Sequence, residues 1–296
     1  MPSAVLCFGE LLWDHLPHGA FPGGAPFNVA YHLHRIGIPV LPVSAIGRDE
    51  PGEKLIAQLQ AWGIATDGIS SATAPTGHVS ATLAQSGDAH YTIAGNVAWD
   101  HIDVDGPPLA AASQAAALVF GSLALRSSAN RESLARLVAA LPVTAWRVFD
   151  VNLRAPHDDP GLVRRYAALA TVLKLNAAEA ARLADNTREF PGREESDARL
   201  LAAQTGVSLV CVTAGARGAG LLHADRWTWM PAQPTAVADT IGAGDAFLAA
   251  LLAGLLRGDK SDTDLLAAAC RHGEWVASHP GATPPYPTPV SCTGPT

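Results

Sequence analysis

Short apolar runs alternate with segments of helical periodicity along most of this chain. Six runs are typical of buried strands: Val5–Leu11, Val40–Ile46, Ala117–Leu123, Arg147–Val151, Val172–Leu175 and Leu209–Thr213. The helical segments are Glu53–Trp62, Arg131–Leu141, Leu162–Ala170, Ala177–Ala184, Asp197–Gln204, Gly244–Leu256 and Asp262–His279. Because parallel strands need crossover connections that pack on the sheet, this alternation predicts a three-layer α/β/α, doubly wound fold with a mostly parallel sheet.

Two early segments interrupt the alternation. Val79–Leu83 and Tyr91–Ile93 flank Ser86-Gly87-Asp88, which predicts an antiparallel hairpin where a crossover helix would be expected. Leu12–Pro26 is rich in proline and glycine and indicates a loop. Spacing alone leaves two interpretations open: the segments meet as a small β lid over the edge of the sheet, or they are unrelated surface loops.

Composition and net charge limit the kinds of molecule that this protein is expected to bind. The chain has 296 residues and a formal net charge of -7, without a basic block, which argues against a nucleic-acid or membrane-binding surface. The longest apolar run, Ala246–Leu256, is shorter than the roughly 20 residues of a membrane span, and the start does not resemble a signal peptide. We therefore expect a cytoplasmic protein that binds small molecules. Four cysteines without paired spacing suggest neither a zinc site nor a redox pair.

The run Asp239–Phe247 carries the clearest chemical signal. Gly242-Ala243-Gly244 precedes an apolar helix, so the backbone can approach a ligand while the first helical N–H groups remain unpaired, as in an anion site. A carboxylate beside an anion site is unfavourable unless it has a role, and Asp245 is placed to take a proton from an attacking hydroxyl. The alternative is a glycine turn followed by an acidic residue, which the helix dipole favours.

The same run closely resembles the C-terminal motif of the ribokinase-like (PfkB) carbohydrate kinase family. Gly23–Ala30 resembles the N-terminal motif of that family, and the two motifs stand in the family's order. The resemblance covers essentially the whole chain. It implies one ribokinase-like domain over residues 1–296, in which lid elements near 12–27 and 76–100 cover an α/β/α core.

The resemblance implies a sugar site near the N-terminus. Asp14 matches the family aspartate that accepts hydrogen bonds from sugar hydroxyls, and Gly23, Gly24 and Asn28 match positions beside it. A carboxylate and a carboxamide suit a polyol because together they accept and donate hydrogen bonds. Without the resemblance, Asp14 is a polar residue after a strand and the two glycines are a turn. Selectivity is expected from lid side chains, namely Tyr91, Ile93, Asn96 and Trp99.

Asp150–Arg154 ends a predicted strand and should place polar side chains at the carboxyl edge of the sheet, where ligands bind in open α/β sheets. The run resembles the D-x-N-x-R segment of fructokinase-like members. It implies that Asn152 contacts the sugar and that the always-charged guanidinium of Arg154 neutralises the transferring phosphate. The alternative for Arg154 is an arginine on a surface turn.

Further elements of the resemblance imply sites for the nucleotide and for cations. Lys174 is expected near the nucleotide, and Asn176 with Glu179 matches an N-x-x-E element that organises magnesium through water. The same pair also fits a helix capping box, and both roles are compatible. The remaining implied residues are Thr213, Gly215 and Gly218 for ATP, with Asp239, Ser278 and Gly281 for a monovalent cation such as K⁺. Where many relatives place an asparagine beside adenine, this chain has Cys270 or Arg271, which puts the base contact in doubt.

The implied reaction is transfer of the ATP γ-phosphate to a primary sugar hydroxyl. Asp245 takes the proton, and the N–H groups of Gly242, Ala243 and Gly244 hold the developing charge. The segments Gly9-Glu10, Gly23–Asn28 and Asn152–Arg154 look most like bacterial-type fructokinases, which form fructose 6-phosphate. Two alternatives stay open: a kinase for ribose, 2-keto-3-deoxygluconate or adenosine, or an inactive sugar-binding regulator. A homodimer formed through the lid is also expected.

Overall fold

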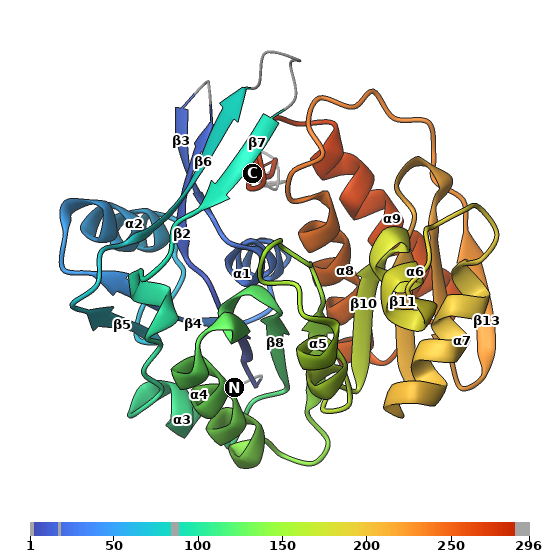
Figure 1. Cartoon of the computed structure of the whole chain (residues 1–296), viewed down its shortest axis with the longest axis horizontal. Helices are drawn as coiled ribbons and strands as arrows, with labels where there is room; N and C mark the ends of the chain where they lie inside the picture. Colours follow the sequence, from blue (N-terminus) through green and yellow to red (C-terminus); the bar gives the residue numbers. More distant parts are fainter. Residues whose placement is uncertain (1–2, 17–18, 84–88, 288–296) are drawn as a thin grey trace, which may run out of the picture.

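A computed structural model describes residues 3–16, 19–83 and 89–287. Over these residues the main sheet has nine strands in the order β13-β12-β11-β10-β9-β8-β1-β4-β5 (Figure 1). The strands from β11 to β5 pair in parallel, whereas β12 and β13 pair antiparallel at one edge. Their bounds are β1 Val5–Phe8, β4 Val40–Gly47, β5 Ile69–Ala72, β8 Ala117–Gly121, β9 Trp146–Asp150, β10 Val172–Asn176, β11 Leu209–Thr213, β12 Ala219–His223 and β13 Arg226–Met230.

Helices cover both faces of this sheet (Figure 1). One face carries α1 Ala25–Arg35, α2 Glu50–Ala61, α8 Ala243–Arg257 and α9 Asp262–Ala277. The other face carries α3 Pro107–Ala112, α4 Ser128–Ala140, α5 Pro160–Ala167, α6 Ala177–Asp185 and α7 Glu194–Thr205. Strand residues alternate between the two cores, so that Val5 and Cys7 of β1 face one and Leu6 and Phe8 face the other. The doubly wound α/β/α prediction is therefore confirmed.

The lid interpretation is also confirmed. A second sheet has the described strands β3-β2-β6-β7, with β2 Leu12–Leu16, β3 Gly19–Gly23, β6 Gly77–Leu83 and β7 Ala89–Ile93. β6 and β7 pair antiparallel as predicted, while residues 84–88, which include the predicted turn, lie outside the described part. The prediction of a loop over Leu12–Pro26 is wrong, because β2 and β3 form an antiparallel pair there and β2 joins β6 in parallel.

The sequence pattern did not predict the strands β12 and β13. β12 and β13 form a hairpin whose turn residues Ala224 and Asp225 both have positive φ, at 48° and 61°. Such turns usually contain glycine or asparagine, so the sequence pattern, with alanine at the first turn position, did not predict a hairpin here. The proline-rich tail from Thr283 predicts a segment that either wraps the surface or is disordered, and through residue 287 it lies against α1 and α9. Among the described residues, no helix is both long and apolar enough to cross a bilayer.

Candidate active site

The predicted site residues gather where strands of the main sheet end and helices begin. Asp150 ends β9, Asn176 ends β10 and Thr213 ends β11, while Asp245 lies in the first turn of α8. A cavity of about 770 Å³ opens between the ends of β10 and β11, the start of α8 and α9. Its lining includes Asn176, Thr213, Gly215, Gly218, Ala243, Gly244, Phe247, Cys270, Gly273 and Glu274. The carboxyl edge of the sheet therefore holds a ligand-sized cavity, as expected for an open α/β sheet.

Asp245 is a buried carboxylate that is 8% exposed. Its Oδ2 accepts a 2.8 Å hydrogen bond from Nδ2 of Asn28 on α1. Burial raises its pKa to about 7, and the nearby charge of Asp150 acts in the same direction, while Lys174, Asn28 and Arg154 oppose them. A carboxyl group with a pKa near neutrality is suited to accept a proton at neutral pH.

The start of α8 is built around two glycines. Gly242 stands at the N-cap in the left-handed region with φ 77°, and no side chain bonds to the helix start there among the described residues. A Cβ on Gly242 would lie 2.6 Å from Cα of Ala282, and a Cβ on Gly244 would lie 3.1 Å from Nζ of Lys174. Only small residues let this helix start come so close to its neighbours. The Ala243 N–H donates to Thr240 O at 3.3 Å, so the other N–H groups of the first turn are the ones that suit an anion.

Lys174 sits at the base of the site and is 7% exposed. Its Nζ donates to both carboxylate oxygens of Asp150, at 3.0 and 3.1 Å. Burial disfavours the charged form of Lys174, but Asp150, Asp245 and Glu179 outweigh it and the pKa is raised. The three acidic side chains therefore stabilise the charged form of this buried ammonium.

Asn176 and Glu179 form a capping box at the start of α6. Asn176 Oδ1 accepts from the Glu179 N–H, and Glu179 Oε2 accepts from the Asn176 N–H, both at 2.9 Å. Glu179 Oε1 also accepts from the Leu153 N–H at 2.7 Å, which ties the loop after β9 to this helix. Burial raises the pKa of Glu179. The capping interpretation is confirmed, and the magnesium role remains a prediction.

The loop after β9 carries Asn152 and Arg154. Asn152 has a positive φ of 42°, which is uncommon for a residue with a side chain. Arg154 is exposed, and its Nη1 donates to its neighbour's carbonyl, Leu153 O, at 3.0 Å. Its charge opposes the rise in pKa that burial causes at Glu10, Asp14 and Asp245, so the guanidinium lies within electrostatic reach of all three.

Asp14 approaches from the lid strand β2. A Cβ on Gly23 would lie 2.0 Å from Asp14 Oδ2, so a larger residue there would push this carboxylate aside. Gly24 has φ 115°, and a Cβ there would lie 2.2 Å from Glu10 O. Burial raises the pKa of Asp14 to about 6, against the charge of Arg154. The predicted sugar residues of the N-terminal motif are thus brought next to the start of α1, which carries Asn28.

Sequence reasoning missed Glu10 as a site residue. Glu10 follows β1 and is only 4% exposed. Its Oε1 accepts from the Ala25 N–H at 3.1 Å, whereas Oε2 has no hydrogen-bond partner among the described residues. Burial raises its pKa to about 7. The sequence could have indicated Glu10 because it lies at the carboxyl end of a predicted strand. The same criterion identified the run from Asp150 to Arg154.

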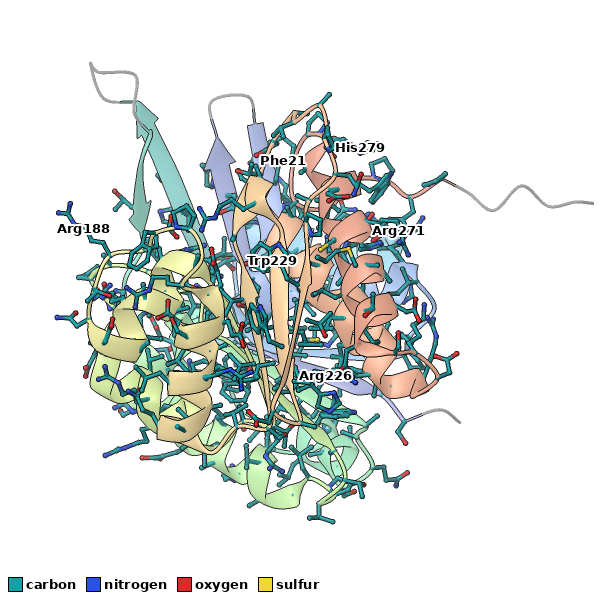
Figure 2. All side chains as sticks on the ribbon, turned by 90° about the vertical axis from the view of Figure 1, so that its right-hand side faces the viewer. Phe21, Arg188, Arg226, Trp229, Arg271 and His279 are labelled. Atoms are coloured by element: carbon teal, nitrogen blue, oxygen red, sulfur yellow. The ribbon has the colours of Figure 1, made fainter. Side chains whose placement is uncertain are left out.

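Three predicted contacts need correction or lie outside the description. Trp99 is fully buried, with its ring 3.8 Å from the Arg126 guanidinium, so in this structure it belongs to the core and does not meet a sugar. Tyr91 lies on β7, but its side chain is outside the described part. Of the two residues considered for the base contact, Cys270 lines the cavity, whereas Arg271 is exposed on α9 and is not among the lining residues (Figure 2).

The loop after β11 and the segment after α9 complete the site. Gly215 and Gly218 have φ values of 56° and 125°, and a Cβ on Gly218 would lie 2.1 Å from Met230 O. Asp239 Oδ2 accepts from the Gly281 N–H at 3.1 Å, so these two predicted cation residues are adjacent. The hydroxyl of Ser278 donates instead to Trp275 O at 2.7 Å.

Comparison with known proteins identifies the family. The pfkB family carbohydrate kinase model matches residues 19–289. A fructokinase from Rhizobium leguminosarum bv. trifolii is 30% identical over 85% of this chain and 79% of its own, and an aminoimidazole riboside kinase from Salmonella typhimurium is 28% identical over 90% and 85%. The structure of a Xylella fastidiosa fructokinase with bound ATP has a TM-score of 0.80 at 25% identity and covers 96% of this chain and 94% of that one. The motifs at both ends of the site and these matches agree that the chain belongs to the pfkB family of carbohydrate kinases.

Proposed function

We propose that this protein transfers the γ-phosphate of ATP to a primary hydroxyl of D-fructose and forms fructose 6-phosphate. The observation that carries the proposal is Asp245, a buried carboxylate with a raised pKa at the glycine-rich start of α8. Fructokinases among the relatives and the ATP-bound fructokinase among similar structures support the donor and the acceptor.

Asp245 acts as the general base in this proposal. Nδ2 of Asn28 donates to Oδ2 of Asp245, which leaves Oδ1 of Asp245 to accept the proton of the attacking hydroxyl. The N–H groups at the start of α8 stabilise negative charge on the transferring phosphoryl group, because they are fixed in place before the reaction. Arg154 adds a permanent positive charge within electrostatic reach of Asp245. In this proposal Asp14, Asn28 and Asn152 bind the sugar.

The cavity fits a nucleotide in size and lining. Its volume of about 770 Å³ lies within the range of small-molecule pockets, roughly 300–1,000 Å³. Thr213, Gly215 and Gly218 stand at one side and can approach phosphate and ribose. Phe247 and Cys270 give another side an apolar surface suited to a base.

Magnesium also fits the donor set. Asn176 and Glu179 supply hard oxygen atoms, which are the ligands that magnesium prefers. Both oxygens of Glu179 already accept backbone N–H groups, so Glu179 and Asn176 would hold the ion through water. When bound, the ion neutralises phosphate charge. Asp239 and Gly281 are the proposed residues for K⁺, with Ser278 beside them.

An ADP-release assay with a substrate panel tests the proposal. The panel contains fructose, ribose, 2-keto-3-deoxygluconate, adenosine and aminoimidazole riboside, each with ATP and magnesium. We expect fructose to give the highest kcat/KM. Strong preference for another member would identify that compound, and not fructose, as the substrate. Aminoimidazole riboside is included because one relative is an aminoimidazole riboside kinase. Binding of fructose and ATP without any turnover would favour a sugar-binding regulator instead.

A further inference from the structure

Residues 281–286 form a segment that we call the C-terminal strap. It runs from the end of α9 across α1 and is held at three points. The Gly281 N–H donates to Asp239 Oδ2 at 3.1 Å, and His32 Nε2 bonds to Ala282 O at 2.9 Å. The hydroxyl of Tyr31 donates to Pro284 O at 2.8 Å. The strap therefore connects the loop before α8 with the helix that carries Asn28.

Tyr286 anchors the far end of the strap between two helices. Its hydroxyl lies 2.8 Å from Nδ1 of His32 on α1 and 2.5 Å from Nε2 of His272 on α9. Its ring packs 4.6 Å from the ring of Trp275, centroid to centroid, and the Arg35 guanidinium lies 5.6 Å from its centre. One side chain thus joins α1, α9 and the strap.

The direction of each hydrogen bond follows from the available protons. Burial lowers the pKa of His32 to about 3 and also lowers the pKa of His272, so both rings are neutral near pH 7. Ala282 O can only accept, so His32 Nε2 carries the proton and Nδ1 accepts from the Tyr286 hydroxyl. Tyr286 has no second proton, so His272 Nε2 donates to it. Removal of the hydroxyl would leave His32 Nδ1 buried without a donor.

The strap contacts both of the helices that carry the Asn28–Asp245 hydrogen bond, at His32 of α1 and at the N-cap of α8. His32 lies one helical turn after Asn28 on α1. Ala282, which His32 holds, packs against the N-cap of α8, where a Cβ on Gly242 would lie 2.6 Å from Cα of Ala282. A shift of the strap would therefore move the start of α8 relative to α1.

We propose that Tyr286 is a positioning residue for phosphoryl transfer, which through the strap fixes the start of α8 against α1. The proposal rests on the role proposed above for Asp245. Tyr286 touches no reacting group in this arrangement, since its ring lies beside α9 and its hydroxyl is used by the two histidines. Its effect should fall on the geometry of catalysis rather than on the affinity for the sugar.

The test is Tyr286→Phe in the full-length protein, with Tyr166→Phe as the matched control. Tyr166 lies on α5, on the opposite face of the sheet, and loses the same hydroxyl. Since small displacements of catalytic groups are costly, we expect Tyr286→Phe to lower kcat about tenfold while KM for the sugar changes less than about threefold. Hydrogen exchange should become faster in the strap and in peptides spanning residues 239–247 but not in the rest of the protein. The control should leave kcat and this exchange unchanged.

Two results would overturn the positioning role. One is an unchanged kcat with unchanged exchange over residues 239–247. The other is a lower kcat with exchange that rises throughout the protein, which indicates general destabilisation. A second variant, His272→Gln, keeps the Tyr286–His32 bond and should have a smaller effect than Tyr286→Phe; a larger effect contradicts the inferred chain of donors. If the wild-type protein phosphorylates no sugar, the proposed function fails, and the exchange comparison alone decides the role of the strap.

Discussion

The carboxyl edge of the main sheet and the lid differ in how they are held. At the sheet edge, charged side chains are buried and bonded to one another, as with Lys174 and Asp150. In the lid, β3 is largely exposed, and Trp13 of β2 is fixed to α2 by one exposed hydrogen bond, from Nε1 to Pro51 O at 2.9 Å. The proposed catalytic residues therefore lie on buried elements of the core. Some of the residues proposed to select the sugar lie instead on the partly exposed lid sheet.

Asp245→Asn should have the largest effect at the sheet edge. The amide keeps the shape of the side chain but cannot accept the hydroxyl proton, so we expect kcat to fall about 10²–10⁴-fold. Steady-state kinetics with the preferred sugar measures this, and Asp67→Asn on an exposed turn is the control. Activity within tenfold of the wild type would show that Asp245 is not the base.

Lys174→Met should mainly affect stability. Removal of one partner leaves Asp150 buried without its cation, and such a loss typically lowers the free energy of unfolding by about 3–5 kcal/mol. Urea unfolding followed by circular dichroism measures the change. The double variant Lys174→Met with Asp150→Asn should recover part of the loss, and a single-variant loss below about 1 kcal/mol would contradict a tightly held sheet edge.

The pH dependence of kcat/KM should report Asp245. Its pKa is raised to about 7, so the carboxylate is lost as pH falls through that value, and kcat/KM should drop about tenfold per pH unit below it. The raised pKa also means that the folded state holds this proton more tightly than the unfolded state. Its contribution to stability is present below about pH 4 and is lost as pH rises through about 7. A kcat/KM profile that is flat from pH 5.5 to 8 would exclude Asp245 as the titrating base.

Trp13→Phe in the lid should have the smallest effect. It removes one exposed hydrogen bond, so the free energy of unfolding should fall by no more than about 1.5 kcal/mol, and kcat should stay within about threefold of the wild type. KM for the sugar should rise a few-fold, because Asp14 is the next residue on the same strand. The control is Trp227→Phe on β13. A loss of stability as large as that of Lys174→Met would remove the contrast between the two regions.

The main sheet was predictable because parallel strands are buried on both faces and are therefore continuous apolar runs. β9, β10 and β11 could be located in this way, together with the polar residues at their ends. The lid strands β2 and β3 could not, because proline and glycine are depleted in strands and here the pairing with β6 decides the conformation.

The site was predictable where several residues form a motif, and less so where one residue acts alone. Asp245, Asn28 and the N-x-x-E pair stand in such motifs, whereas Glu10 is a single carboxylate within an apolar stretch. Trp99 shows the opposite error. An aromatic residue after a lid hairpin suggests a sugar contact, but the chain turns back into the core there and the Arg126 guanidinium covers the ring. Only the path of the folded chain decides whether such an aromatic side chain reaches the sugar site or the core.

The parallel pairing of β2 with β6 implies an order of folding. Leu12 pairs with Gly77, and the chain between them forms β3, α1, β4, α2 and β5. Closing so long a loop is entropically costly until the intervening segment is compact, so the lid should assemble after the N-terminal half of the main sheet. Before that step, the β6–β7 hairpin has an unpaired edge, and protein emerging from the ribosome or refolding from denaturant should be most prone to aggregate there.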